Sequence, residues 1–259
     1  MSETPRASAV PQLLAGRRAL VTGGGRGLGG ATVAGFAAMG AHGAALDLPG
    51  TDFSDLPEGW VGVGCDVTDE AQVAPAVATA VEHLGGLDAV VAAAGVVPVW
   101  QEPAALDLDD FDRVMAVNVH GVAATLKHVA PHLGAGSAVT VIGSLNSWRG
   151  DGRIWSYVAS KHAVLGLVRS AAASLGAHGV RVNAVGPGPV ATEALVGRME
   201  ARAEATATGL DEALAQAARA TALGRIATVD DVVNTIAFLT SDLAGGVTGQ
   251  LLPVDGGLL

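Results

Sequence analysis

Short apolar runs alternate with longer helical stretches along the chain, and this alternation constrains the fold more than any other feature. Each apolar run is nearly continuous, which is typical of strands buried on both faces. Helices between such strands indicate a parallel sheet covered by helices on both faces, and right-handed crossovers then predict a doubly wound α/β fold. The expected strands are Ala19–Thr22, Gly43–Asp47, Val61–Gly64, Ala89–Ala93, Ala138–Ile142, Arg181–Val185 and Gln250–Pro253. The expected helices are Gly27–Met39, Asp69–Leu84, Asp109–Leu133, Trp155–His178 and Val229–Thr240.

The alternation is not interrupted by a linker rich in proline or serine, so we expect one domain over residues 14–259, after a mobile N-terminal arm at residues 1–13. One segment, at about residues 190–222, departs from the strand–helix rhythm. It is rich in alanine and lies at the carboxyl end of the sheet. A long connection at this place is typical of a lid that covers a functional site. A helical hairpin on the surface is the alternative.

The composition excludes several classes of protein. Half of the 259 residues are hydrophobic and 15% are charged, which is typical of a folded globular chain. The net charge of −10, without any basic run, argues against nucleic acid as a partner. The single cysteine, Cys65, excludes a disulfide framework and a cysteine-based metal site. The seven histidines lack metal-ligand spacing, so we expect no metal.

The compartment follows from similar arguments. The N-terminus lacks a basic stretch followed by an apolar one, so we expect no signal peptide. The charge-free stretch Gly27–Leu46 is long enough to resemble a membrane span, but it contains six glycines and lies between a turn and a strand. We interpret it as a buried helix followed by a strand. The sequence thus predicts a soluble, cytoplasmic protein without a membrane partner.

A glycine-rich loop, Thr22–Gly29, follows the first expected strand and opens the first expected helix. Glycines let the backbone approach a pyrophosphate, and the helix N-terminus presents free N–H groups to it. The register is open, because Gly25, Gly27 and Gly30 also fit the spacing G-x-G-x-x-G. The sequence therefore predicts a dinucleotide site at this loop.

Asp47 ends the next expected strand, 18 residues beyond Gly29. A carboxylate there accepts hydrogen bonds from the adenosine ribose hydroxyls and repels a 2′-phosphate, which favours NAD over NADP. Arg26 opposes this prediction, because its guanidinium could pair with that phosphate. The alternative for Asp47 is that it only caps the loop.

Tyr157 and Lys161 lie four residues apart on an expected helix, so both point to one face. The chain has one tyrosine and two lysines, Lys127 and Lys161. A free tyrosine has a pKa near ~10, and a nearby cation lowers it, so that the phenol can exchange a proton with a substrate oxygen. Ser144 follows a strand 13 residues upstream of Tyr157, where its hydroxyl could bond the same oxygen.

These motifs, in this order, resemble the short-chain dehydrogenase/reductase family in its compact, single-domain branch, and the similarity covers roughly Leu14 to Leu259. The resemblance implies a Rossmann fold with seven parallel strands. The family's motif positions fall on Thr22, Gly23, Gly27, Gly29, Asp47, Asp66, Val67, Asn118, Ser144, Tyr157, Lys161, Pro187 and Gly188, and its C-terminal pattern on residues 248–250 and 254–257.

The resemblance also implies a mechanism. Ser144 and Tyr157 hold the substrate oxygen, and Tyr157 takes or donates its proton. Lys161 lowers the pKa of the tyrosine and bonds the nicotinamide ribose, while Asn118 positions a water that continues a proton relay. Hydride passes between a secondary alcohol or ketone and NAD(H). The expected cofactor contacts are Gly23, Arg26, Gly27, Leu28, Gly29, Asp47, Leu48, Asp66, Val67, Ala94, Gly95, Tyr157, Lys161, Pro187, Gly188, Val190 and Thr192.

One motif departs from the family. Members usually have Asn-Asn-Ala-Gly after the fourth strand, and this chain has Ala92-Ala93-Ala94-Gly95. The side-chain amides that would brace the backbone beside the cofactor are therefore missing. Gly95 is kept. We expect reduced local rigidity with unchanged proton-transfer chemistry.

The substrate contacts are expected in loops at the carboxyl end of the sheet. Three of the four tryptophans lie in such segments, which suggests an apolar or cyclic alcohol or ketone. The alternative is that these aromatic residues only pack the lid. Arg149 and Arg153 could instead hold an anionic or polyhydroxylated substrate, although their charged segment favours solvated side chains. The expected substrate residues are Val96, Trp100, Leu145, Trp148, Trp155, Pro189, Leu195 and Met199.

Two helices, at Asp109–Leu133 and Trp155–His178, would form the interface of a homotetramer by resemblance, with a dimer as the fallback. Their alanines would allow close packing: Ala116, Ala123, Ala124, Ala159, Ala163 and Ala171. Two other functions stay open. An NADP-dependent 3-oxoacyl-carrier-protein reductase shares the motifs, but Asp47 and the net charge of −10 oppose it. A non-catalytic dinucleotide sensor on the same fold would be free to lose its catalytic residues, and this chain keeps them.

Overall fold

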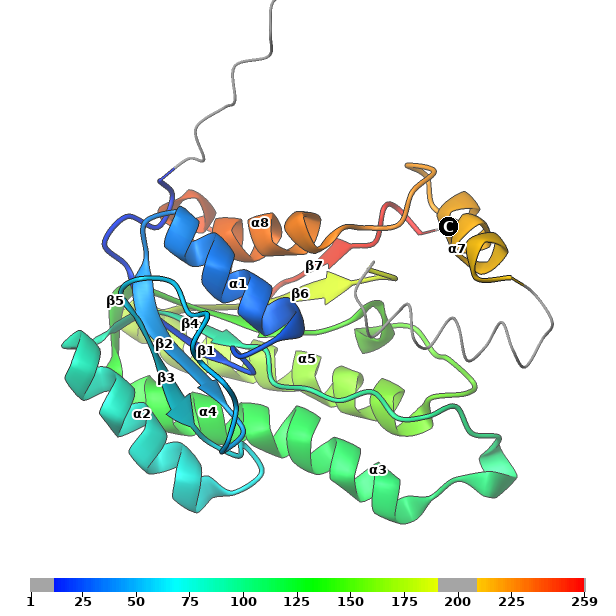
Figure 1. Cartoon of the computed structure of the whole chain (residues 1–259), viewed down its shortest axis with the longest axis horizontal. Coiled ribbons are helices and arrows are strands. Elements are labelled where there is room, and N and C mark those ends of the chain that lie inside the picture. The colour runs from blue at the N-terminus through cyan, green and yellow to red at the C-terminus, as the bar shows by residue number, and fades with distance from the viewer. Residues whose placement is uncertain (1–11, 191–208, 259) are drawn as a thin grey trace, which may run out of the picture.

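The computed structural model describes residues 12–190 and 209–258. A single parallel sheet with the strand order β3-β2-β1-β4-β5-β6-β7 runs through the molecule (Figure 1). The expected doubly wound fold with seven parallel strands is confirmed. The strands are β1 (Arg18–Thr22), β2 (His42–Asp47), β3 (Trp60–Gly64), β4 (Leu87–Ala92), β5 (Leu133–Ile142), β6 (Arg181–Pro187) and β7 (Leu251–Val254).

Helices cover both faces of the sheet, as Figure 1 shows. Helices α1 (Gly27–Ala38) and α8 (Val229–Thr240) pack on one face, through Phe36 and Ile236. On the other face lie α2 (Glu70–Leu84), α4 (Gly121–Val129) and α5 (Trp155–Leu175). Two further helices are α3 (Leu108–Met115) and α7 (Leu210–Arg219). Short 3₁₀ turns lie at Pro103–Ala105, Ala130–His132, Leu145–Ser147, Gly176–His178 and Asp242–Ala244.

Local sequence sets where the helices begin and end. The Asp69 carboxylate accepts a hydrogen bond from the Ala71 N–H at the start of α2. Gly85 ends this helix with a φ of 73°, a left-handed conformation that glycine adopts without strain. Thr228 and Asp231 form a reciprocal capping box at the start of α8. These caps fix where the helices begin and end between the strands.

The edge strands differ from the prediction that every strand is buried on both faces. In β3, Trp60 is buried but Gly62 and Gly64 are exposed, and in β7 Leu252 and Pro253 are exposed. The prediction was wrong here because helices cover the inner strands on both sides, whereas the two edge strands are covered only in part. The central strands β1, β4 and β6 are buried along most of their length, as expected.

Most element boundaries lie within about three residues of the prediction, and two elements differ more. Strand β5 starts at Leu133 rather than at Ala138, since residues 134–137 form an irregularity in the pairing with β4 and carry no apolar pattern. The expected helix Asp109–Leu133 is divided into α3, a π turn at Ala116–His120, α4 and a 3₁₀ turn. The prediction treated this stretch as one continuous helix and missed the π turn.

The ends of the expected arm and lid are described in part. Residues 1–11 lie outside the described residues. Gln12 and Leu13 were expected in the mobile arm, but Gln12 Nε2 donates to the Ala38 carbonyl at 3.1 Å and Leu13 packs against the core beneath α1. Of the expected lid, residues 191–208 lie outside the described residues, and α7 occupies most of the remainder. None of the helices in residues 12–190 and 209–258 is long and apolar enough to cross a bilayer.

Candidate active site

The carboxyl ends of the strands open into a cavity of about 940 Å³. Its wall is formed by the turn between β1 and α1, the segments that follow β2 to β6, and one face of α5. Every predicted cofactor residue within the described part of the chain lines it, and Thr192 lies outside the described residues. These residues are Gly23, Arg26, Gly27, Leu28, Gly29, Asp47, Leu48, Asp66, Val67, Ala94, Gly95, Tyr157, Lys161, Pro187, Gly188 and Val190.

The glycine loop packs too closely for a Cβ at four positions: Gly23, Gly24, Gly25 and Gly29. A Cβ on Gly29 would lie 1.9 Å from the Gly23 carbonyl oxygen, and one on Gly23 would lie 2.8 Å from the Ala94 backbone. Gly23 also has a φ of 66°. A Cβ on Gly30 would come no closer than 3.4 Å to another atom, which is ordinary contact. The geometry therefore favours the register of Gly23, Gly27 and Gly29 over the alternative that uses Gly30.

Asp47 both lines the cavity and holds the loop. Its Oδ2 accepts a hydrogen bond from the Gly25 N–H at 2.8 Å, and its Oδ1 accepts one from the Leu48 N–H at 2.8 Å. The two interpretations of this residue are thus compatible, because a carboxylate has free lone pairs after accepting one bond at each oxygen.

The Ala92-Ala93-Ala94-Gly95 segment after β4 is braced from a neighbouring strand. The Thr22 hydroxyl oxygen lies 3.2 Å from the Ala93 nitrogen and 3.4 Å from the Ala94 nitrogen, and both N–H groups donate to it. This hydroxyl holds the backbone at the point where the family has side-chain amides. The expected loss of rigidity is therefore offset in part by Thr22 at the end of β1.

The expected acid–base group lies on the wall. Lys161 is buried, and its Nζ lies 5.5 Å from the centroid of the Tyr157 ring. The Nζ also donates to the Ile142 carbonyl at 2.7 Å, and burial lowers the pKa of Lys161 to about 8. Ser144 is buried at the end of β5, where its Oγ accepts from the Asn146 N–H at 3.1 Å. Ser144, Tyr157 and Lys161 all line the one cavity.

Asn118 lies in the π turn, beside this group and fully buried. Its Oδ1 accepts from the Val96 N–H at 2.8 Å. Its Nδ2 donates to the Val96 carbonyl at 2.9 Å and to the Ser160 Oγ at 3.0 Å. Both amide N–H groups are thus occupied within the protein. The Asn118 side chain acts as a clamp between two segments, and a water in the predicted relay would have to bond another group of this turn.

The predicted substrate residues are brought together only in part. Val96 lines the cavity, whereas Leu145, Trp148, Trp155 and Pro189 do not line it in the described structure. Leu195 and Met199 lie outside the described residues. These residues lie beyond the strand ends, in or next to the 3₁₀ turn after β5, at the start of α5 and after β6, so the strand-end rule that placed the cofactor residues does not apply to them.

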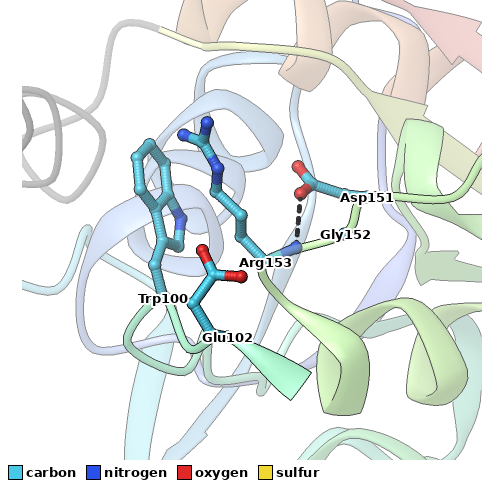
Figure 2. Close-up of a pocket in the computed structure, with 5 residues that line it drawn as sticks. All are labelled: Trp100, Glu102, Asp151, Gly152 and Arg153. Atoms are coloured by element: carbon cyan, nitrogen blue, oxygen red, sulfur yellow. Dashed lines mark hydrogen bonds between the residues drawn. The ribbon is translucent and has the colours of Figure 1, made fainter. Parts of the chain in front are cut away.

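A separate, shallower hollow of about 470 Å³ lies between two loops, lined by Trp100, Glu102, Asp151, Gly152 and Arg153. Figure 2 shows the Arg153 side chain beside the Trp100 indole, with its guanidinium carbon 5.3 Å from the ring centroid. The Arg153 carbonyl accepts from the Gln101 N–H at 3.0 Å, which joins the two loops. Arg153 and Trp100 are both exposed, so the hollow is an outer feature.

Sequence reasoning missed several cavity residues: Ala31, Cys65, Ala93, Val97, Val117, Ile142, Gly143 and Val229. Cys65, Ala93, Ile142 and Gly143 adjoin predicted residues at strand ends, and that adjacency could have found them. Val117 and Val229 carry no such signal. Burial raises the pKa of the Cys65 thiol to about 11, so the thiol is neutral at physiological pH. Among residues 12–190 and 209–258, no group of three or more His, Cys, Asp and Glu side chains could hold a metal ion.

Comparison with known proteins extends these observations to the whole chain. A family model described as enoyl-(acyl carrier protein) reductase matches residues 23–259. Over 256 residues the chain is 39% identical to the (−)-isopiperitenol/(−)-carveol dehydrogenase, mitochondrial, of Mentha piperita, with 95% of this chain and 94% of that protein covered. It is 38% identical to (+)-borneol dehydrogenase 2 of Salvia officinalis, with 98% and 93% covered.

A solved structure is similar over nearly the same length. The aldohexose dehydrogenase of Thermoplasma acidophilum, in its ligand-free form, aligns with a TM-score of 0.85 at 26% identity, covering 95% of this chain and 94% of that one. Similarity in sequence and in structure thus extends from the glycine loop to the C-terminal strand.

Proposed function

The chain belongs to the short-chain dehydrogenase/reductase family, and on this premise we propose that it interconverts a cyclic secondary alcohol and its ketone with NAD(H). The observation that carries the proposal is the Tyr157–Lys161 pair, with Lys161 buried, on the wall of a cavity rimmed by the glycine loop. The family binds a nicotinamide dinucleotide cofactor.

The cavity fits such a cofactor. A Cβ on Gly27 would meet no protein atom within 4 Å, so the backbone faces the cavity there, where a pyrophosphate would lie at the N-terminus of α1. Asp47 would hold the adenosine ribose, Asp66 and Val67 the adenine, and Lys161 the nicotinamide ribose. When bound, the nicotinamide would supply a hydride acceptor or donor.

The chain's own residues would handle the oxygen and its proton. Ser144 Oγ and the Tyr157 phenol would bind the substrate oxygen, and Tyr157 would take the hydroxyl proton in oxidation or return it in reduction. The Lys161 ammonium favours the phenolate form, because an opposite charge nearby stabilises an anion in a buried site. Asn118 would hold the segment around Val96 beside them, through the two bonds already described.

The prediction of NAD over NADP rests on Asp47. Its carboxylate lines the cavity and would repel a 2′-phosphate at the ribose. Arg26 also lines the cavity, and its guanidinium could pair with that phosphate. We infer that Asp47 outweighs Arg26, because Asp47 is fixed by two hydrogen bonds.

The substrate class rests on relatives and on the cavity wall. The two plant dehydrogenases named above act on cyclic terpenoid alcohols. In this chain, Val96, Val97 and Val117 add apolar side chains to the wall near the catalytic group. An apolar wall beside two hydroxyl groups suits a compact ring that bears one oxygen.

A panel of alcohols and ketones tests the proposal. We expect reduction of NAD with cyclic terpenoid alcohols. The kcat/KM should be at least about tenfold higher with NAD than with NADP, and higher with cyclic than with linear alcohols. Equal or better activity with NADP and a 3-oxoacyl thioester would instead favour the carrier-protein reductase. Dinucleotide binding without turnover of any substrate in either direction would favour the sensor.

Two further expectations concern assembly and compartment. We propose a homotetramer that packs through α4 and α5, where Ala123, Ala159, Ala163 and Ala171 are half-buried in one chain. We also keep the cytoplasm as the expected compartment, since one cysteine in 259 residues suits a reducing environment. Light scattering of the purified protein and fractionation of its cells test these two expectations.

A further inference from the structure

Ser160 lies between Tyr157 and Lys161 on α5, and the proposed mechanism does not use it. Its side chain is fully buried. The hydroxyl donates to the Tyr157 carbonyl at 2.8 Å and accepts from the Asn118 Nδ2 at 3.0 Å. One oxygen therefore joins the main chain of the expected acid–base residue to a residue 42 positions away.

The second bond places Ser160 in a continuous set of contacts. Asn118 binds both the N–H and the carbonyl of Val96, and Val96 lines the cavity next to Gly95. Asn118 itself lies in the π turn, where the Gly121 N–H bonds to the Ala116 carbonyl five residues back. The contacts thus run from the segment after β4, through the π turn, to the turn of α5 that carries Tyr157.

We propose that Ser160 is a positioning residue that fixes Tyr157 and Lys161 relative to the π turn and the segment after β4. The proposal rests on the proposed function, because it assumes that Tyr157 exchanges the proton. Without the Ser160 oxygen, the buried Asn118 amide loses an acceptor, and a buried N–H without a partner is unfavourable. The π turn and α5 then shift relative to each other, and the acid–base pair moves with α5.

A serine that bonds back within its own helix is common and by itself means little. Ser174 on the same helix shows this case, since its Oγ donates to the Ser170 carbonyl at 2.7 Å from an exposed position. Ser160 differs from Ser174 in its burial and in its bond to another element. Ser174→Ala is therefore a matched control for Ser160→Ala.

The first measurement compares kcat, KM and cofactor affinity in the two variants. We expect Ser160→Ala to lower kcat about tenfold to a hundredfold, since a displacement of about 1 Å at a reacting group costs as much. The dissociation constant for NADH should change less than about threefold in both variants. Ser160→Cys keeps the size of the side chain with a poor acceptor, and it should lose activity as Ser160→Ala does. Wild-type kcat in Ser160→Ala, or in Ser160→Cys alone, would overturn the proposal.

A second measurement needs no turnover. Tyr157 is the only tyrosine of the chain, so the absorbance change of phenolate formation reports it without background. If Ser160 positions Tyr157 beside Lys161, half-formation of phenolate should move to higher pH in Ser160→Ala and stay in place in Ser174→Ala. An unchanged titration contradicts the positioning role. If instead the titration moves but no substrate is turned over by the wild type, the proposed function fails and the positioning role stands.

A double-mutant cycle tests the route through Asn118. Asn118→Ala and Ser160→Ala remove the two ends of one contact, so the double variant should lose no more kcat than the worse single variant. Losses that multiply would show that Ser160 acts independently of Asn118, which contradicts the proposed route.

Discussion

The cavity wall and the separate outer hollow around Trp100 and Arg153, termed the mouth, are built differently, although both lie at the carboxyl edge of the same sheet. The wall consists largely of residues at or next to strand ends, such as Asp47, Gly95 and Ser144, and the side chains of Asp47 and Ser144 accept hydrogen bonds from backbone N–H groups. The mouth consists of loop residues such as Trp100 and Arg153, which are exposed and contact each other. Strand pairing fixes the positions of strand ends, whereas a loop side chain depends on its own neighbours.

The difference teaches which part of such a site tolerates change. A wall residue has few alternative positions, so a substitution there disturbs binding or chemistry directly. A mouth residue can move aside. Four experiments use this comparison, from the largest expected effect to the smallest.

Tyr157→Phe should give the largest effect. It removes one hydroxyl from the wall and leaves the ring, so NADH binding should stay within about threefold while kcat falls by about 10³-fold or more, given the usual value of a positioned acid–base group. Steady-state kinetics and a binding titration measure the two quantities. Turnover close to that of the wild type would refute the role of Tyr157.

Gly29→Ala should come next. Its Cβ would lie 1.9 Å from the Gly23 carbonyl oxygen, so the loop must open and affinity for NADH should fall about a hundredfold. Gly30→Ala is the matched control, because it lies next in the same helix and its nearest contact would be 3.4 Å. The control should keep its affinity within about twofold and gain some helix stability. Equal affinities in the two variants would mean that the loop is not a rigid part of the wall.

The buried cation of the wall makes a prediction about pH. The pKa of Lys161 is about 8 in the folded chain and 10.5 for a lysine exposed to water, so the unfolded chain binds more protons between these two pH values. The comparison uses Tyr157→Phe, in which no phenol titrates, and Tyr157→Phe/Lys161→Met. The free energy of unfolding of the first variant should therefore increase relative to that of the second from pH 8 upward. The total change is about 3 kcal/mol at most. Below pH 8 the difference between the two variants should be constant.

Urea unfolding at a series of pH values measures this effect. Lys127→Met in the same background is the control for the loss of a lysine, because the Lys127 side chain is largely exposed. A flat difference for Lys161 would show that water reaches its ammonium in the folded chain.

The mouth should give the smallest effect. Trp100→Ala removes the partner of Arg153 but touches no part of the cavity, so kcat/KM for a cyclic alcohol should change less than about threefold. Val96→Ala removes two methyl groups from the wall and should lower kcat/KM about tenfold. If Trp100→Ala proves the more damaging change, the hollow beside Arg153 takes part in substrate binding, and the division between wall and mouth fails.

The same division explains what the sequence could predict. Strand ends follow from the alternation of apolar runs and from the parallel topology, and the predicted dinucleotide residues come together for that reason. The side chains of Leu145, Trp148 and Trp155 could not be placed in this way, because Leu145 and Trp148 lie in or next to the 3₁₀ turn after β5 and Trp155 begins α5. Tryptophan in a loop signals a surface or a contact, without saying which.

Two other features lay beyond the sequence for a different reason. The π turn around Asn118 adds about one residue to a helical turn, and the prediction of one continuous helix did not recognise that added residue. The bond from Thr22 to the Ala93 and Ala94 amides depends on the distance between two neighbouring strands. Both features depend on packing. The effect of the missing side-chain amides at residues 92–93 on local rigidity could therefore be assessed only from the structure.

The dual position of Asp47 has a consequence for protein engineering. A change of cofactor preference would begin by replacing this carboxylate with a small neutral residue, so that a 2′-phosphate is admitted. That replacement also removes the acceptor of the Gly25 N–H and frees the turn that faces the phosphates. Selection for NADP use must then restore order in the turn with a second substitution. In this chain, cofactor preference and the order of the glycine turn both depend on Asp47. A library that varies only this residue would therefore contain mostly enzymes that bind both cofactors weakly.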